Sequence, residues 1–182
     1  MHLLEKTIKS QTIYEGKIIT VKKDEAELEN GTTATRELVV HNGGVCIVPI
    51  NEKGEVLLVK QFRYPFKEVL IEIPAGKLEA DESHREAGLR ELKEETGAVC
   101  KKFEYIGVMY PSVAYLSEKI HMYIAYDLSF EEQNLDSDEF LDVFAVKLED
   151  AVDMVMKNEI KDGKTQTALL MAYNIIKKNT DR

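Results

Sequence analysis

Three glutamates near the middle of the chain have the spacing of a cation-binding helix face. Glu91 lies three residues before Glu94 and four before Glu95, so on a helix their side chains share one face. Like charges repel there, and Arg90, four residues before Glu94, offsets only part of that repulsion. Hard carboxylate oxygens suit Mg²⁺ or Mn²⁺, which engage substrate phosphates. The cluster predicts a divalent-metal site, with a solvated, charge-rich helix face as the alternative.

The residues around this cluster follow a fixed pattern. Residues 76–98 read GKLEADESHREAGLRELKEETGA. This stretch resembles the Nudix box, G-x(5)-E-x(7)-R-E-U-x-E-E-x-G-U, in which U is a bulky apolar residue. Seven identities carry the resemblance: Gly76, Glu82, Arg90, Glu91, Glu94, Glu95 and Gly97. Ala98, at the final U, is small but apolar. The resemblance implies an enzyme that hydrolyses nucleoside diphosphates linked to another moiety, and the fixed spacing disfavours a plain surface helix.

The box is predicted to form a helix over residues 83–96. Asp81 or Ser83 can cap its N-terminus, and the glycine near the end of the box is a natural C-terminal stop. Leu89 and Leu92, three residues apart, form a narrow apolar stripe. We therefore expect this helix to pack on a sheet through the two leucines.

Composition limits the class of protein. The chain has 182 residues, 44% hydrophobic and 31% charged, which suits one domain with at most a small appendage. Its net charge of −9 argues against nonspecific nucleic-acid binding. Cys46 and Cys100 are expected to be reduced, buried thiols, since no CxxC or Cys/His cluster is present. No apolar run reaches about 18 residues and the N-terminus lacks a signal-peptide core, so we expect a cytoplasmic protein without a membrane span.

The first part of the chain reads as a small sheet. It predicts three strands, over 7–16, 17–28 and 33–41, and Asn30-Gly31 is a strong hairpin signal between the last two. The turn-forming residues Asn42-Gly43-Gly44 then interrupt the strand pattern. We place the boundary there, between an N-terminal β-sheet region at 1–42 and a main domain at 43–182.

The main domain alternates strands with helices. A turn at Glu52-Lys53-Gly54 predicts that 45–50 and 55–64 pair as a hairpin. Further strands are expected over 69–74, 103–110 and 119–128, and amphipathic helices over 148–159 and 164–179. This order predicts an α/β sandwich. It agrees with a Nudix fold, in which a mixed sheet lies between helices, preceded here by the N-terminal antiparallel sheet.

The resemblance extends to one branch of the family. The three-stranded N-terminal region, then VKQFRY, EIPAGKLE, the box and SEKIHMYIA, look like the ADP-ribose pyrophosphatase branch. That branch splits ADP-ribose into AMP and ribose 5-phosphate. Its members are typically homodimers in which the N-terminal sheet completes the partner's substrate site.

Matched positions imply roles near the metal. Glu91, Glu95 and the backbone carbonyl of Ala75 match metal ligands, with Mg²⁺ as the cofactor and Mn²⁺ as a substitute. Glu94 matches a supporting ligand and Arg90 the residue that orients the glutamates, so both belong to the implied catalytic machinery.

Other matched positions imply contacts with substrate. Arg63 matches an arginine that binds the diphosphate, for which a bidentate guanidinium is well suited. Arg36 resembles an arginine that reaches the nucleotide from the N-terminal sheet. Glu72 matches an acidic residue beside the substrate or metals, and an exposed strand residue is its alternative.

An acidic loop follows the last predicted strand. Residues 135–142 read LDSDEFLD. Glu139 aligns best with the branch's acidic loop residue, which serves as general base or further metal ligand, and Asp136 and Asp138 lie nearby. A solvated acidic loop is the alternative.

Two departures keep other substrates open. Val113 stands where the branch usually has a proline, and Ala114 replaces a glycine in the same loop. The chain has no Trp to stack on adenine; Tyr14 could stack or simply pack. Another nucleoside diphosphate derivative, such as a nucleotide sugar, NADH or a dinucleoside polyphosphate, is therefore the alternative substrate. A non-catalytic binding module is disfavoured because every box glutamate is present.

Overall fold

The computed structural model describes residues 2–137 and 139–180. The chain forms two compact units. One comprises Met1–Gly43 with Tyr110–Lys119, and the other comprises Gly44–Met109 with Ile120–Arg182. The segment Tyr110–Lys119 therefore groups with the N-terminal residues, although it follows the box in sequence.

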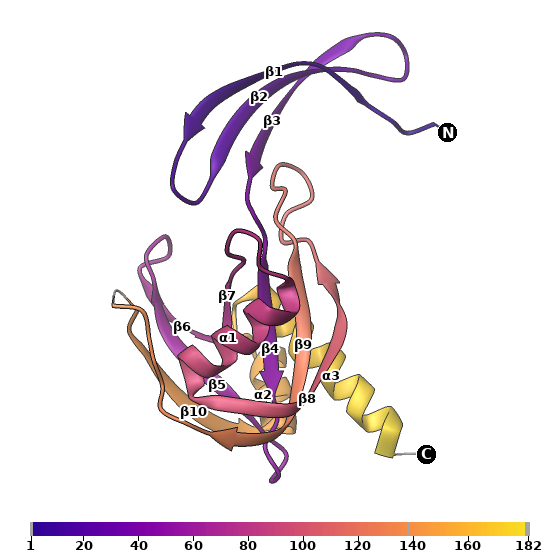
Figure 1. The fold of residues 1–182 in the computed structure, drawn as a ribbon. Helices are drawn as coiled ribbons and strands as arrows, with labels where there is room; N and C mark the ends of the chain where they lie inside the picture. Colours follow the sequence, from indigo (N-terminus) through magenta and orange to yellow (C-terminus); the bar gives the residue numbers. More distant parts are fainter. Residues whose placement is uncertain (1, 138, 181–182) are drawn as a thin grey trace. The chain divides into compact units, whose positions relative to one another are not determined.

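The first unit is an antiparallel sheet in the order β1-β2-β3 (Figure 1). Its strands are β1 (Lys6–Glu15), β2 (Thr20–Glu27) and β3 (Thr33–Val40), which confirms the three predicted strands. Gly31 has a φ of +79° and its N–H donates to the carbonyl of Leu28 at 2.9 Å, as the predicted turn requires. The segment 110–119 joins this unit through Val39, whose N–H donates to the carbonyl of Tyr115 at 2.7 Å.

The second unit is built on a mixed sheet in the order β7-β4-β9-β8. These strands are β7 (Ala75–Lys77), β4 (Gly44–Pro49), β9 (Ile120–Phe130) and β8 (Ala98–Met109). β4 runs parallel to β9, and the other pairs are antiparallel. All six residues of β4 are buried, because its two faces contribute to two different hydrophobic clusters. Burial on both faces explains its continuous apolar sequence.

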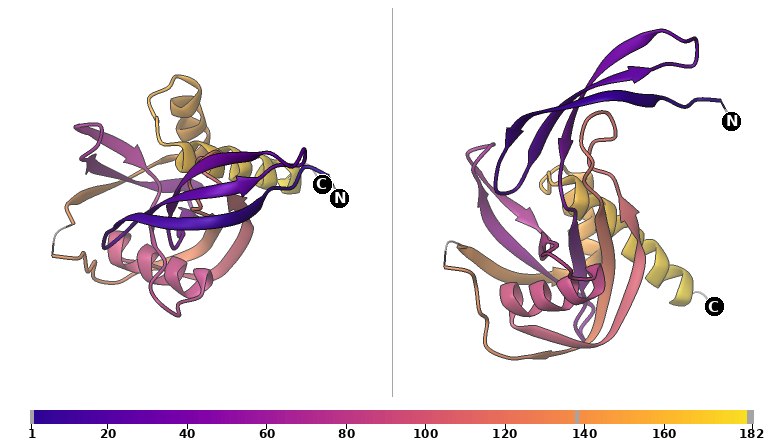
Figure 2. Two further views of the ribbon diagram at one scale, coloured as in Figure 1. Left: turned by 90° about the horizontal axis from the view of Figure 1, so that it is seen from above. Right: turned by 45° about the horizontal axis from the view of Figure 1, so that its top comes forward.

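Helices cover both faces of this sheet. α1 (His84–Thr96) packs on one face, with Val45 and Ile47, and α2 (Leu148–Met156) and α3 (Gly163–Thr180) pack on the other, with Cys46 and Val48. Figures 1 and 2 show the two layers on opposite sides of β4 and β9. The predicted α/β/α arrangement with a mixed sheet is thus confirmed. Within the described residues, no helix combines the length and apolar character that a membrane crossing requires.

A second, three-stranded sheet corrects one prediction. It has the antiparallel order β10-β5-β6, from β10 (Leu141–Lys147), β5 (Glu55–Arg63) and β6 (Glu68–Glu72). The predicted hairpin between 45–50 and 55–64 is wrong, because β4 pairs with β7 and β9. Among the described residues, the two segments share one isolated bridge, Ile50–Val56. The turn itself forms, with the N–H of Gly54 donating to the carbonyl of Asn51. β10 was not predicted.

Both ends of α1 have capping residues. Ser83 is the N-cap and forms a capping box with Glu86, and Gly97 ends the helix with a φ of +68°. Leu92 is fully buried, but Leu89 is 36% exposed, so the predicted two-leucine stripe is wrong. The residues of α1 that face the interior are Ala87, Gly88, Glu91, Leu92, Glu95 and Thr96. Two carboxylates thus lie on the packed face of the helix.

Candidate functional site

The two buried carboxylates of α1 lie against the backbone of β7. Glu91 is 8% exposed and Glu95 only 2%. The N–H of Ala75 donates to Oε2 of Glu95 at 3.1 Å. At Gly76, a Cβ would lie 1.8 Å from Oε1 of Glu91. A side chain in place of the first glycine of the box would therefore have to displace the carboxylate of a glutamate from the same box.

Burial raises the pKa of both carboxyl groups. Burial, together with the charges of Glu91 and Glu139, raises the pKa of Glu95 to about 8, against the lowering effect of the Ala75 N–H and Arg63. Burial also raises the pKa of Glu91, although Arg90 opposes the shift. The surroundings of the two carboxyls thus disfavour their ionised forms, and the Ala75 N–H, Arg63 and Arg90 offset this only in part.

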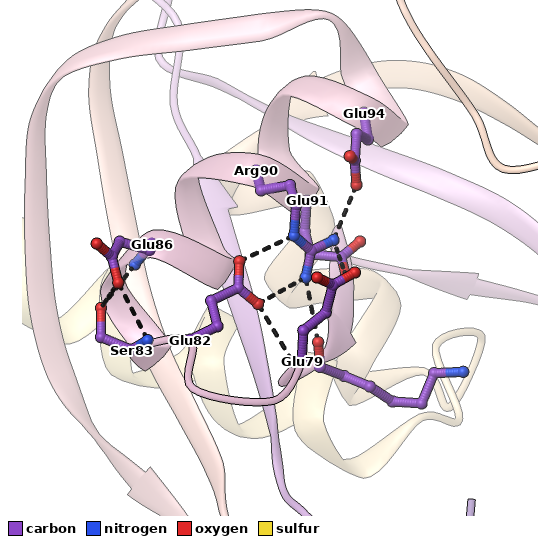
Figure 3. Close-up of polar contacts among 8 residues, drawn as sticks. Glu79, Glu82, Ser83, Glu86, Arg90, Glu91 and Glu94 are labelled. Atoms are coloured by element: carbon purple, nitrogen blue, oxygen red, sulfur yellow. Dashed lines mark hydrogen bonds and ion pairs between the residues drawn. The ribbon is translucent and has the colours of Figure 1, made fainter. Parts of the chain in front are cut away.

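Arg90 contacts three glutamates of the box (Figure 3). Its guanidinium donates to Glu82 through Nε at 2.9 Å and Nη2 at 3.0 Å, and through Nη1 to Glu91 at 2.8 Å and Glu94 at 2.9 Å. The carboxylate of Glu82 contributes most to raising the pKa of Arg90. The predicted pairing of Arg90 with Glu94 is confirmed. The contact with Glu82 was not foreseen, although its fixed place in the box was a signal.

Arg63 and Glu72 form a second ionic group, on β5 and β6. Arg63 donates to Glu72 through Nε at 2.5 Å and Nη2 at 2.7 Å. Glu72 is 1% exposed, so its alternative interpretation as an exposed strand residue is wrong. Burial alone would raise the pKa of Glu72, but Arg63 and Lys164 together hold it below its usual value. Lys164 was missed; its signal was a lysine in the first turn of a helix, where the dipole disfavours a cation.

The loop between β9 and β10 is hydrogen-bonded to the C-terminal end of α1. The side chain of Gln133 donates to the backbone carbonyl of Glu95 at 2.5 Å. The N–H of Asn134 donates to the backbone carbonyl of Glu94 at 3.2 Å. Glu139 follows in this loop, and its charge helps raise the pKa of both buried carboxylates. The N–H of Glu139 donates to the carbonyl of Asp136 at 3.0 Å. Asp138 lies outside the described residues.

The remaining predicted residues lie in the N-terminal unit. Arg36 makes a two-point contact with Glu5, through Nε at 2.8 Å and Nη2 at 2.5 Å. Val113 is 84% exposed and Tyr14 is 57% exposed. The structure therefore gathers the residues of α1, β7 and the β9–β10 loop in one unit, and it leaves Arg36 in the other.

The donor set fits a hard divalent cation. Glu91 and Glu95 are buried carboxylates whose charge a cation would neutralise. As they stand, residues 2–137 and 139–180 contain no three His, Cys, Asp or Glu side chains that form a metal-holding group. Glu91 and Glu94 are instead turned toward Arg90 (Figure 3).

The close approach at Gly76 generates a stability prediction. Gly76→Ala places a methyl group on the carboxylate of Glu91, and we expect this overpacking to cost about 1–3 kcal/mol. Thermal unfolding should then show a Tm lower by roughly 2–12 °C. Gly163→Ala is the matched control, since nothing lies within 4 Å of its added Cβ, and its Tm should not fall. Equal Tm values for the two variants would contradict the assigned packing.

Comparisons with known proteins agree with the fold and the box. Residues 40–168 match the NUDIX domain, and residues 5–39 match the nucleoside diphosphate sugar hydrolase N-terminal domain. The chain is 42% identical to the ADP-ribose pyrophosphatase of Bacillus subtilis (strain 168), over 92% of this chain and 91% of that protein. It is 40% identical to the methanol dehydrogenase activator of Bacillus methanolicus, over 91% and 90%.

A solved structure shares the whole architecture. The crystal structure of an ADP compounds hydrolase superposes with a TM-score of 0.88 at 23% identity, covering 98% of this chain and 97% of that one. The resemblance predicted from the box and from the flanking segments is confirmed. This chain belongs to the Nudix hydrolase family.

Proposed function

We propose that this enzyme hydrolyses the diphosphate of ADP-ribose, or of a related ADP-sugar, to AMP and a sugar phosphate such as ribose 5-phosphate. The observation that carries the proposal is the 42% identity to a protein named ADP-ribose pyrophosphatase, which extends over 92% of the chain. It therefore includes the N-terminal region as well as the Nudix domain. The buried glutamates of α1 supply the chemistry that such a reaction needs.

We assign metal binding to Glu91, Glu95 and the backbone carbonyl of Ala75, with Mg²⁺ as the cation and Mn²⁺ as a substitute. When bound, Mg²⁺ would neutralise the diphosphate oxygens and activate a water molecule. The burial and the raised pKa values of the two glutamates support this assignment. Arg90 orients Glu91 and Glu94 through its ion pairs.

Arg63 is assigned to the substrate diphosphate. Its side chain is 36% exposed, and it directs only Nε and Nη2 toward Glu72. The edge that carries Nη1 can donate to a phosphate oxygen. Glu72 holds this guanidinium in place, and Arg36 is assigned to the nucleotide from the N-terminal sheet.

Glu139 is assigned as general base. The box glutamates are committed to the cation, so the proton of the attacking water needs another acceptor. The charge of Glu139 acts on both Glu91 and Glu95, which supports its place near the reacting atoms. Asp136 is the alternative base in the described part of the loop.

Another nucleoside diphosphate sugar is the second candidate substrate. The chain is also 33% identical, over 72% of its length, to the GDP-mannose pyrophosphatase of Citrobacter koseri. Val113, in the loop where the branch usually has a proline, is 84% exposed. Its position in that loop is the feature that favours a changed substrate.

We further propose that the enzyme is a homodimer joined through its N-terminal sheet. Every residue of β1 is exposed, and the exposed apolar side chains of this region are Leu3, Leu4, Ile8, Ile13, Tyr14 and Ile18. Such a concentration of apolar surface is typical of a protein interface. We propose a cytoplasmic location as well, consistent with two free cysteines, Cys46 and Cys100.

The first test of function is a substrate panel with a catalytic control. We expect ADP-ribose to lead ADP-sugars, GDP-mannose, NADH and diadenosine polyphosphates in kcat/KM, measured as phosphatase-coupled phosphate release with Mg²⁺. Glu95→Gln should lower kcat by at least about 100-fold and should reduce the rise in Tm that Mg²⁺ causes. A different leading compound would move the assignment to the second candidate. Near-normal turnover in folded Glu95→Gln would remove Glu95 from the cation site.

The base assignment predicts a contrast within one loop. Glu139→Gln keeps the shape of the side chain but cannot accept a proton, so we expect kcat to fall about 100-fold. The Mg²⁺-induced rise in Tm should persist. Asp136→Asn, three residues earlier in the same loop, is the matched control and should change kcat by less than about threefold. The reverse order of the two effects would transfer the role to Asp136.

The dimer proposal predicts a mass of twice the chain's 20.7 kDa by light scattering. The double variant Ile8→Asp/Ile13→Asp places charges on the exposed apolar surface of β1 and should shift the protein toward the monomer mass. Met156→Asp alters another exposed apolar residue, on α2 and 73% exposed, and should leave the mass unchanged. A wild-type enzyme of monomer mass would exclude the proposed interface.

A further inference from the structure

A cluster of four charged side chains lies at the start of α3. Its members are Arg63, Glu72, Asp162 and Lys164. Glu72 is 1% exposed, and the Lys164 side chain is 13% exposed. Lys164 Nζ donates to Oε2 of Glu72 and, at 3.0 Å, to Oδ2 of Asp162. The two positive and two negative formal charges balance, so the cluster is neutral as a whole.

The position of Lys164 is unfavourable for α3 considered alone. It lies in the first turn of the helix, where the helix dipole disfavours a cation. Burial also opposes its charge, but the carboxylates of Glu72 and Asp162 raise the pKa of Lys164 above its usual value. A charged lysine at this end of a helix is explained by the two carboxylates that its ammonium group contacts, Glu72 and Asp162.

Lys164 and Arg63 share one oxygen of Glu72. A two-point Arg–Glu pair is electrically neutral by itself. Here Lys164 donates to the same Oε2 that accepts from Nη2 of Arg63, and it also donates to Asp162, so two carboxylates serve two cations. Glu72 is thus held from two sides, by Arg63 and by Lys164, and the charge of Arg63 acts on Glu95, lowering a pKa that burial and Glu91 raise.

The first turn of α3 also fixes the chain next to Glu72. The hydroxyl of Thr165 accepts from the N–H of Ile73 at 3.0 Å and donates to Oδ2 of Asp162 at 2.5 Å. The carboxylate of Glu72 and the backbone that follows it are thus held by consecutive residues of α3. Glu72 has little freedom to turn, and neither has the guanidinium that it binds.

We propose that Lys164 is a positioning residue that holds Glu72 so that Arg63 presents the edge of its guanidinium that carries Nη1 to the substrate diphosphate. The inference rests on the proposed function, because it assumes that Arg63 contacts a diphosphate. It concerns binding rather than bond cleavage. Loss of Lys164 should therefore raise KM more than it lowers kcat.

The test compares Lys164→Met with Lys161→Met in ADP-ribose hydrolysis. Lys161 lies three residues earlier and pairs with Glu68 at 2.8 Å on the surface, with 53% of its side chain exposed. Both variants lose one positive charge. We expect Lys164→Met to raise KM about tenfold and to change kcat by less than about threefold, while Lys161→Met changes neither. Lys164→Arg, which keeps the charge, should recover part of the lost KM.

The outcomes separate this inference from the proposed function. A wild-type enzyme inactive on ADP-ribose contradicts the substrate assignment, and the KM comparison is then made with whichever compound leads the panel. If no compound is hydrolysed, the positioning role is overturned as well. If the wild type is active but folded Lys164→Met has the KM of Lys161→Met, only the positioning role is overturned. A fall in Tm with an unchanged KM would likewise leave Lys164 a structural residue.

A second comparison applies even if Lys164→Met does not fold. The Glu72→Gln/Lys164→Met variant removes two opposite buried charges together and is measured against Glu72→Gln alone. Because Lys164 is inferred to act through Glu72, the two KM values should agree within about twofold. A further rise of KM in the double variant would overturn the inference, since Lys164 would then act on substrate without Glu72.

Discussion

The burial of Glu91 and Glu95 on the packed face of α1 is the constraint on which the rest of the site depends. A helix normally turns apolar residues toward a sheet, and carboxylates in that place cost stability unless something compensates them. The surrounding residues supply the compensation that the structure shows. The backbone N–H of Ala75 meets Glu95 and the guanidinium of Arg90 meets Glu91. The absence of a side chain at Gly76 leaves room for Glu91.

Within the second unit, two helices on opposite faces of one strand carry charged side chains of the site. β4 is buried on both sides, so α1 and α3 are each packed firmly against it. α1 contributes the two buried carboxylates, and the first turn of α3 contributes Lys164 to Glu72. A rigid central strand suits a reaction in which phosphate oxygens have to be held by groups from several elements.

Local relations were predictable from sequence, and distant ones were not. The ends of α1, its shared glutamate face and the Arg90–Glu94 pair all follow from spacings of a few residues. The pairing of Lys164 with Glu72 joins positions 92 residues apart, and no periodicity reports it. The false hairpin had a related cause, because the turn at Gly54 is real while strand partners are chosen by the whole sheet. Leu89 was misplaced because Glu91 and Glu95, which read as polar, occupy the inner face.

The contrast between short-range and long-range relations also explains why the box indicates the type of reaction but not the identity of the substrate. In the proposed mechanism, the box glutamates and Arg90 act on groups that every nucleoside diphosphate derivative shares, namely phosphate oxygens and a water. Relatives named for ADP-ribose and for GDP-mannose both align with this chain, so the box alone cannot separate the two. The segments that could differ, residues 5–39 and 110–119, belong to the other unit. These segments, the first of which carries Arg36, can therefore differ between relatives with different substrates while the carboxylates of the box, Glu91 and Glu95, stay unchanged.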